Sequence, residues 1–229
     1  MKENQTTDLL ETTASGLSRR RFFGLAGGIA GAGLVLGAAG CKNNDDENGI
    51  NLGSGDVGIL NYAYALEQLE AAFYVQVIKT PYNNISAYEL SLLTDIRDHE
   101  IAHREFFKAA IGSSNAIPGL EVNFTSINFA DRTSVLGTAK AFEDLGVSAY
   151  NGAGKLIASA DYLTLAGKIV SVEARHAALI RDLITPGTFA NSEVIDANGL
   201  DKSRSPNEVL SIAGTYLYSK LNASNLPTS

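Results

Sequence analysis

The feature that most constrains this chain is a Glu-x-x-His motif that occurs twice, as Glu100-Ile-Ala-His103 and as Glu173-Ala-Arg-His176. Both copies lie in stretches whose apolar residues recur at helical spacing. Residues three apart lie on the same face of a helix, so each motif directs a carboxylate and an imidazole toward one place. Two helices of this kind are expected to share one polar pocket.

A further glutamate precedes each motif on a separate amphipathic stretch. Glu67 stands in Ala-Leu-Glu-Gln-Leu and Glu143 in Ala-Phe-Glu-Asp-Leu, and a tyrosine follows each at the same distance, Tyr74 and Tyr150. The chain therefore contains two copies of one helical hairpin. We predict an all-α four-helix bundle with a carboxylate metal site. The alternative is that the histidines lie at the surface and hydrogen-bond there.

The apolar spacing and the helix start and stop signals predict five helices, over residues 57–78, 86–111, 132–159, 161–184 and 205–221. Residues 112–131 are irregular and partly strand-like, and we interpret them as a long crossover between the hairpins. Such a crossover is expected to let the third helix start at the same end as the first. The short last helix is expected to pack against the bundle, and residues 222–229 to be disordered.

The N-terminus carries the pattern of an export signal. Residues 18–25, Ser-Arg-Arg-Arg-Phe-Phe-Gly-Leu, resemble a twin-arginine motif, and an apolar run rich in glycine and alanine follows to Gly40. This run is less hydrophobic than a usual membrane span, although an N-terminal membrane anchor is the alternative. We predict a Tat-type lipoprotein signal peptide over residues 1–40.

The single cysteine, Cys41, ends Leu-Gly-Ala-Ala-Gly-Cys, which resembles a lipoprotein box with Ala38 in place of the usual leucine. Lipidation of Cys41 would hold the mature chain on a membrane, in the periplasm or at the cell surface. Residues 41–56 are polar and glycine-rich and are expected to form a flexible tether to a domain over residues 57–221. One cysteine excludes internal disulfides and a cysteine-ligated iron centre.

The charge of the chain argues against nucleic acid as a partner. The formal net charge is -7, and removal of residues 1–40 takes away four basic and three acidic residues, which leaves -8. No basic patch stands out in this acidic remainder. An acidic surface is too common to indicate cation handling by itself.

The glutamates and the two motifs resemble the six-ligand signature of the ferritin-like superfamily, the di-iron carboxylate bundles that include rubrerythrin and bacterioferritin. Tyr74 also matches this signature. Residues 61–74, Asn-Tyr-Ala-Tyr-Ala-Leu-Glu-Gln-Leu-Glu-Ala-Ala-Phe-Tyr, and residues 205–210 are similar to an exported ferritin-like family related to plant desiccation-related proteins. The resemblance covers residues 56–221, and it implies a ferritin-like fold with the metal ligands Glu67, Glu100, His103, Glu143, Glu173 and His176.

This ligand set suits two iron ions, with manganese as the other possibility. Four carboxylates offset the charge of two divalent ions, with Glu100 and Glu173 bridging both and the other two glutamates capping one ion each. Each histidine would add one nitrogen, which leaves positions open for oxygen, peroxide or water.

Three residues near the ligands leave alternatives open. Glu70 competes with Glu67 for the first ligand position, but in the aligned repeat Glu70 falls on Gly146 whereas Glu67 falls on Glu143. Glu70 could then lie beside the metals or act as an alternate ligand. Tyr74 is the candidate catalytic residue, since it and Tyr150 could supply a hydrogen bond or an electron, or could simply pack in the bundle. His99 lacks a motif, and we interpret it as structural or solvent-facing.

Two function classes follow from this reading. The first is an exported di-iron oxidoreductase that reduces oxygen or peroxide, and it requires an external electron donor because the chain has no rubredoxin-like cysteines. The second is a stress-related or desiccation-related scaffold lipoprotein whose metals only stabilise the fold. A storage cage fits poorly with a lipid tether, whereas a homodimer is compatible with both classes.

Overall fold

The computed structural model describes residues 48–228. The described residues group into one compact unit. The predicted signal peptide over residues 1–40 and the lipidation site Cys41 lie outside the described residues, so both stay predictions. Within the described part of the chain, no helix combines the length and the apolar character that crossing a membrane requires.

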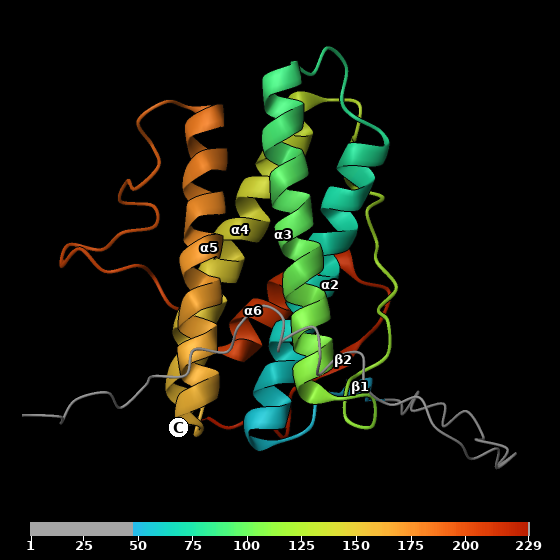
Figure 1. The fold of residues 1–229 in the computed structure, drawn as a ribbon, viewed down its shortest axis with the longest axis vertical. Helices are drawn as coiled ribbons and strands as arrows, with labels where there is room; N and C mark the ends of the chain where they lie inside the picture. Colours follow the sequence, from blue (N-terminus) through green and yellow to red (C-terminus); the bar gives the residue numbers. More distant parts are fainter. Residues whose placement is uncertain (1–47, 229) are drawn as a thin grey trace, which may run out of the picture. The chain divides into compact units, whose positions relative to one another are not determined.

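Four long helices form the bundle shown in Figure 1, and their bounds are α2 Gly55–Lys79, α3 Ala87–Ile111, α4 Arg132–Ala153 and α5 Ala160–Ile184. A short 3-10 turn, η1 Gly154–Leu156, extends α4, and the C-terminal part adds α6 Pro206–Ala213 followed by η2 Gly214–Tyr216. The prediction of an all-α four-helix bundle with a short C-terminal helix is confirmed.

The helices begin where side chains can satisfy their first backbone N–H groups. Ser86 accepts a hydrogen bond from the Glu89 backbone at 3.0 Å before α3, and Asp131 accepts one from Ser134 at 2.7 Å before α4. Ser205 and Glu208 form a capping box at the start of α6, where Pro206 occupies the first turn. These caps explain why the helix starts predicted from the sequence lie close to those in the structure.

The last helix is shorter than predicted, because the chain leaves it to pair with the crossover. The backbone N–H of Tyr218 donates to the Glu121 carbonyl at 2.8 Å, and Leu217 bridges Val122. The third predicted helix, over residues 132–159, also ends early, because α4 and the turn η1 stop at Leu156. In the break before α5, Asp56 accepts hydrogen bonds from the backbone N–H groups of residues 158 and 159.

The crossover over residues 112–131 fixes the direction of the third long helix. The backbone N–H of Asn83, just after α2, donates to the Ala130 carbonyl, just before α4, at 3.1 Å. Helix α4 therefore begins at the end of the bundle where α2 ends. The expectation that it starts where the first helix starts is wrong, and Figure 1 shows the crossover running along the bundle instead. A long connection is needed because α3 and α4 run in the same direction.

Buried polar side chains of α2 hold this crossover in place. The Asn61 amide donates to the Asn115 carbonyl at 2.9 Å and accepts from the Ile117 backbone at 3.0 Å. Gln68 accepts from the Leu120 backbone at 2.9 Å. Helix α2 is consequently covered on almost every side and forms the centre of the core.

The two ends of the described chain pair with each other. Strand β1 Ile50–Asn51 runs parallel to β2 Leu221–Asn222, and Leu52 and Leu226 are buried nearby. These contacts order residues that were expected to lie in a flexible tether and a disordered tail. Two backbone hydrogen bonds and the burial of two leucines supply the free energy that the isolated segments lack.

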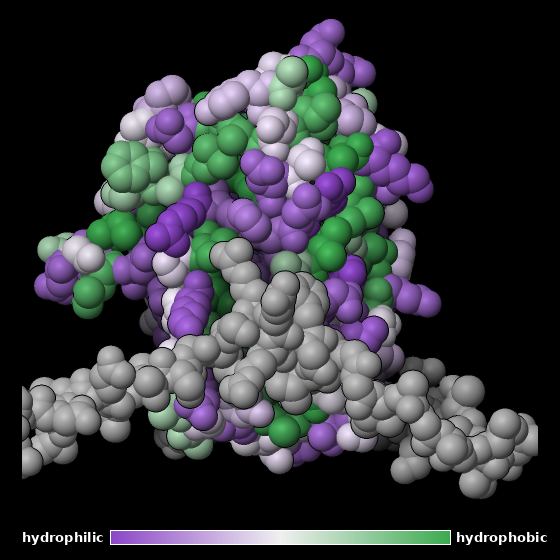
Figure 2. Space-filling view, viewed as in Figure 1, coloured by the Kyte–Doolittle hydropathy of each residue, from purple (hydrophilic) through white to green (hydrophobic). Residues whose placement is uncertain are grey.

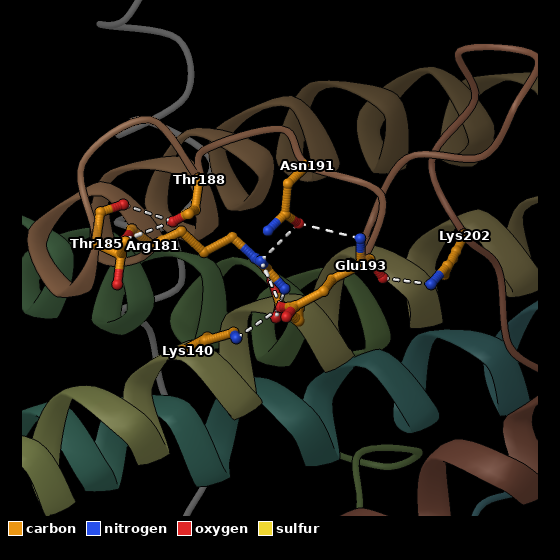
Figure 3. Close-up of polar contacts among 8 residues, drawn as sticks. Lys140, Arg181, Thr185, Thr188, Asn191, Glu193 and Lys202 are labelled. Carbon is orange, nitrogen blue, oxygen red and sulfur yellow. Dashed lines mark hydrogen bonds and ion pairs between the residues drawn. The ribbon is translucent and has the colours of Figure 1, made fainter.

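The loop after α5 is fastened to the bundle by Arg181, whose residue exposure is only 3% (Figure 3). Its guanidinium donates to both carboxylate oxygens of Asp144 at 2.8 and 2.6 Å, and to Glu193 at 3.0 Å. Lys140 binds the same Glu193 carboxylate at 2.8 Å. Arg181 therefore ties α4, α5 and the loop together through Asp144, the residue after Glu143.

One glycine is required where the end of this loop crosses α4. A Cβ atom at Gly152 would lie 1.7 Å from the carbonyl oxygen of Arg204, and the Arg204 backbone donates to the Ser148 carbonyl at 3.0 Å. On the face drawn in Figure 2, hydrophilic side chains lie among hydrophobic ones wherever grey atoms do not cover it.

Candidate metal centre

The six predicted ligands meet in the middle of the bundle, because each stands near the centre of its helix. Helices α2 and α4 contribute one glutamate each, and α3 and α5 contribute a glutamate and a histidine each. All four glutamates are fully buried, and His176 is 4% exposed. The residues brought together are Glu67, Glu100, His103, Glu143, Glu173 and His176.

These residues form two overlapping groups, each able to hold one ion. Within each group, one ligand atom from every residue lies within 4.8 Å of the others. Glu67 and His103 belong to the first group and Glu143 and His176 to the second, whereas Glu100 and Glu173 belong to both. Shared carboxylates are what two neighbouring metal ions need for bridging.

Each histidine directs its Nδ1 atom at the shared glutamate of the other hairpin. His103 Nδ1 lies 2.8 Å from Glu173 Oε1, and His176 Nδ1 lies 2.8 Å from Glu100 Oε1. These close pairs are not aligned as hydrogen bonds, and both nitrogens lack a hydrogen-bond partner. The geometry is that of donor atoms converging on a common centre.

Buried polar atoms without a partner provide the test of whether a metal fits. Among the described residues, eight such atoms belong to the cluster: one oxygen each of Glu67 and Glu143, both oxygens of Glu100 and Glu173, and Nδ1 of each histidine. Buried polar atoms are rarely left unsatisfied in folded proteins. Two bridging carboxylates, two terminal carboxylates and two imidazoles would use these eight atoms, so the residues fit a pair of metal ions.

Tyrosine hydroxyls occupy the remaining oxygens of the two terminal glutamates. Tyr74 donates to Glu143 Oε1 at 2.5 Å, and Tyr150 donates to Glu67 Oε1. Each tyrosine thus reaches from one hairpin to the glutamate of the other. Tyr74 and Tyr150 contact the cluster directly, beyond the packing role that the sequence left open.

The electrostatics of the cluster, free of metal, favour bound positive charge. Burial raises the pKa of Glu67 to about 7 and also raises the pKa of Glu143. Burial raises the pKa of Glu173 well above its usual range, and the neighbouring carboxylates raise it further. Burial alone would lower the histidine pKa values, yet the surrounding carboxylates raise that of His103 to about 12 and that of His176 to about 10. The site therefore attracts cations strongly.

Glu70 lies beside the cluster but belongs to neither group. It is 4% exposed, and a Cβ atom at Gly146 would lie 3.1 Å from Glu70 Oε1 and 3.7 Å from Glu173 Oε2. Burial raises the pKa of Glu70 well above its usual range, and Glu173 and the other carboxylates add to this effect. The structure brings Glu67, rather than Glu70, among the candidate ligands, and the missing side chain of Gly146 leaves room for the Glu70 carboxyl group.

The sequence reasoning missed the place of His99. This residue is exposed, but its Nδ1 atom lies 2.9 Å from His176 Nε2, and the two rings are nearly parallel, at 7°. The sequence does show one difference between the two motifs, since His99 precedes Glu100 whereas Val172 precedes Glu173. The two motifs therefore differ at one polar position next to a ligand.

A small apolar cavity of about 20 Å³ lies next to the cluster, lined by residues of all four long helices. Leu66, Phe107 and Tyr150 are among its walls, and Tyr150 also contacts Glu67. The space suffices for about one water-sized molecule. It offers a place for a small apolar reactant, and none for a large substrate.

The fold and the cluster together define a helical-bundle protein whose core is compatible with metal binding. A profile of the ferritin-like domain family matches residues 55–186, more than half of the chain. The chain therefore belongs to the ferritin-like domain family, as its ligand signature predicted. A comparison with curated proteins finds no significant match. The narrower resemblance to the exported, desiccation-related group stays a prediction.

Proposed function

We propose that this protein binds two transition-metal ions, iron or manganese, in the cluster. The proposal is carried by one observation, the eight buried donor atoms that have no hydrogen-bond partner. Oxygen and imidazole donors without thiolate suit iron and manganese better than softer metals. Glu100 and Glu173 would bridge the ions, and Glu67 and Glu143 would each hold one.

We further propose that the centre reacts with oxygen or hydrogen peroxide. A ferrous pair can supply the two electrons that, with two protons, reduce one hydrogen peroxide to two waters. Tyr74 and Tyr150 each hold one oxygen of a terminal glutamate, and the other oxygen of each glutamate, which has no hydrogen-bond partner, would be available to hold an ion. The apolar cavity beside Tyr150 gives room for a molecule of the size and apolar character of oxygen.

The cellular setting of the proposal rests on the N-terminal sequence. Residues 18–25 and Cys41 support export by a twin-arginine route and lipid anchoring outside the cytoplasm. Re-reduction would then need an electron donor from outside the chain.

Metal loading followed by oxidant exposure tests this function. The chain from residue 42 onward is expected to bind two ferrous ions without oxygen, and near-ultraviolet absorption of ferric iron should appear when oxygen or peroxide is added. A Glu100→Gln, His176→Ala double variant should lose both responses, whereas Asp98→Asn, an exposed neighbour, should keep them. Equal peroxide consumption by the wild type and the double variant would contradict the proposal.

A non-catalytic scaffold is the second candidate, and the tight enclosure of the site favours it. The ligand glutamates are fully buried, and the adjoining cavity holds little more than one small molecule. Bound metal would then only neutralise the buried charges and stabilise the bundle. A large rise in melting temperature on metal binding, without oxygen or peroxide consumption, would select this candidate.

A further inference from the structure

The contact between His99 and His176 distinguishes the two halves of the centre. His176 is buried and directs Nδ1 at Glu100, 2.8 Å away, while its other nitrogen, Nε2, lies 2.9 Å from His99 Nδ1. The two ring planes are nearly parallel, at 7°, and the ring centroids lie 5.1 Å apart. The His99 side chain is exposed on its other side.

The chemistry of imidazole assigns the roles in this contact. A neutral histidine that binds a metal through Nδ1 must carry its proton on Nε2. In His176 that proton points at His99 Nδ1, which must then be the acceptor and hold its own proton on Nε2. The hydrogen bond fixes the tautomer and the ring orientation of His176, as partners of metal-bound histidines commonly do.

We propose that His99 is a positioning residue for the ion held by Glu143 and His176 together with the shared glutamates. This inference rests on the proposed function, since it concerns how one of the two proposed ions is held. No comparable contact is found for His103 among the described residues. The position that corresponds to His99 in the second motif is Val172, which has no polar side chain. The two ion positions are therefore unequal, and the one at His176 is the better organised.

Two substitutions of similar shape separate a positioning role from a merely structural one. Asparagine places Oδ1 at the same number of bonds from Cβ as histidine Nδ1, so His99→Asn retains an acceptor. His99→Leu has nearly the shape of asparagine but offers no acceptor. His99→Leu leaves a nitrogen of the buried His176 without its partner, so the melting temperature of each metal-free variant is measured first, and both variants, changed at an exposed position, should still fold.

The experiment measures cobalt(II) binding to the full-length protein, followed by the visible absorption of the bound ion. His99→Leu should weaken the binding of one of the two ions by about 10–100-fold, and His99→Asn should restore most of that loss. In a His103→Ala background, which retains the position at His176, the same loss should appear. In a His176→Ala background, His99→Leu should change nothing.

The outcomes separate this inference from the function on which it rests. A wild-type protein that binds no cobalt would refute the proposed function, and this inference with it. Two bound ions in the wild type, with no loss in His99→Leu or with equal losses of both ions, would refute the positioning role alone. The same would follow if His99→Asn lost as much affinity as His99→Leu.

Discussion

Replacement of Tyr74 by phenylalanine tests whether the tyrosine hydroxyls hold the terminal glutamates in place. Tyr74 is fully buried, and its hydroxyl donates to Oε1 of Glu143, which is also fully buried. Tyr74→Phe removes one oxygen atom and leaves the aromatic packing intact, so the cost comes from the oxygen left without a partner. An unsatisfied buried acceptor costs about 1–3 kcal/mol, and a charged one lies in the upper part of that range.

For the metal-loaded protein we therefore expect a loss of about 2 kcal/mol, which lowers the melting temperature by about 4–8 °C in a domain of this size. The affinity for the ion held by Glu143 should fall about tenfold or more, because the carboxylate is no longer oriented. Thermal unfolding with and without metal measures the first effect, and a metal-binding isotherm measures the second.

Tyr82→Phe is the matched control. The Tyr82 hydroxyl also donates to a glutamate at 2.5 Å, but Glu89 keeps Arg132 as a partner and its side chain is 14% exposed. Its loss should cost about 1 kcal/mol or less and leave metal affinity unchanged. If Tyr74→Phe proved no more damaging than Tyr82→Phe in either assay, the argument that Tyr74 orients Glu143 would fail.

Three further changes test other parts of the structure. The metal-free protein should lose stability as the pH rises. Folding raises the pKa of Glu67 from 4.5 to about 7 and that of His103 from 6.5 to about 12, so above pH 4.5 the folded chain binds more protons than the unfolded chain. A melting temperature that rises between pH 5 and pH 8 without metal would contradict this. Ala149→Leu should fill the apolar cavity and slow oxidation of bound iron. The control Ala139→Leu, at an equally buried position of the same helix outside the cavity, should cost similar stability, about 1–3 kcal/mol, without slowing oxidation. Equal oxidation rates of the two variants in stopped-flow traces would exclude the cavity as the route of the oxidant. Arg181→Leu should destabilise the protein by about 2–3 kcal/mol in denaturant unfolding, since it removes the partner of Asp144 and one of the two cations that bind the Glu193 carboxylate. The exposed Arg175→Leu should change stability by less than about 0.5 kcal/mol. Similar losses in both variants would contradict the tie between α4, α5 and the loop.

Much of the candidate site was predictable because its geometry is local. The spacing of Glu100 and His103 puts both on one face of a helix whatever the surroundings. The repeat of the hairpin then implies that Glu67 and Glu143 face the same centre. Side-chain caps such as Ser86 fixed the helix starts for the same reason, since a cap involves only the residues next to it.

The features that escaped prediction depend on how segments distant in sequence meet. The pairing of residues 50–51 with 221–222, and the passage of Arg204 over Gly152, leave no periodic pattern in the chain. The direction of α4 follows from the path of the crossover, which the helix pattern does not specify. The contact of His99 with His176 depends on how far α3 and α5 are rotated about their axes, and no motif in either helix encodes that rotation.

The two hairpins supply equivalent ligands but unequal surroundings, and the differences converge on one helix. In the aligned repeats, Glu70 corresponds to Gly146 and His99 corresponds to Val172. Both polar members come from the first hairpin, and both lie next to ligands on α5: Glu70 beside Glu173, and His99 against His176. The second hairpin makes no equivalent contact with α3, because Gly146 and Val172 have no polar side chain. An approximately symmetric set of candidate ligands thus lies in asymmetric surroundings, so two ions bound there would have different neighbours, and we expect different affinities.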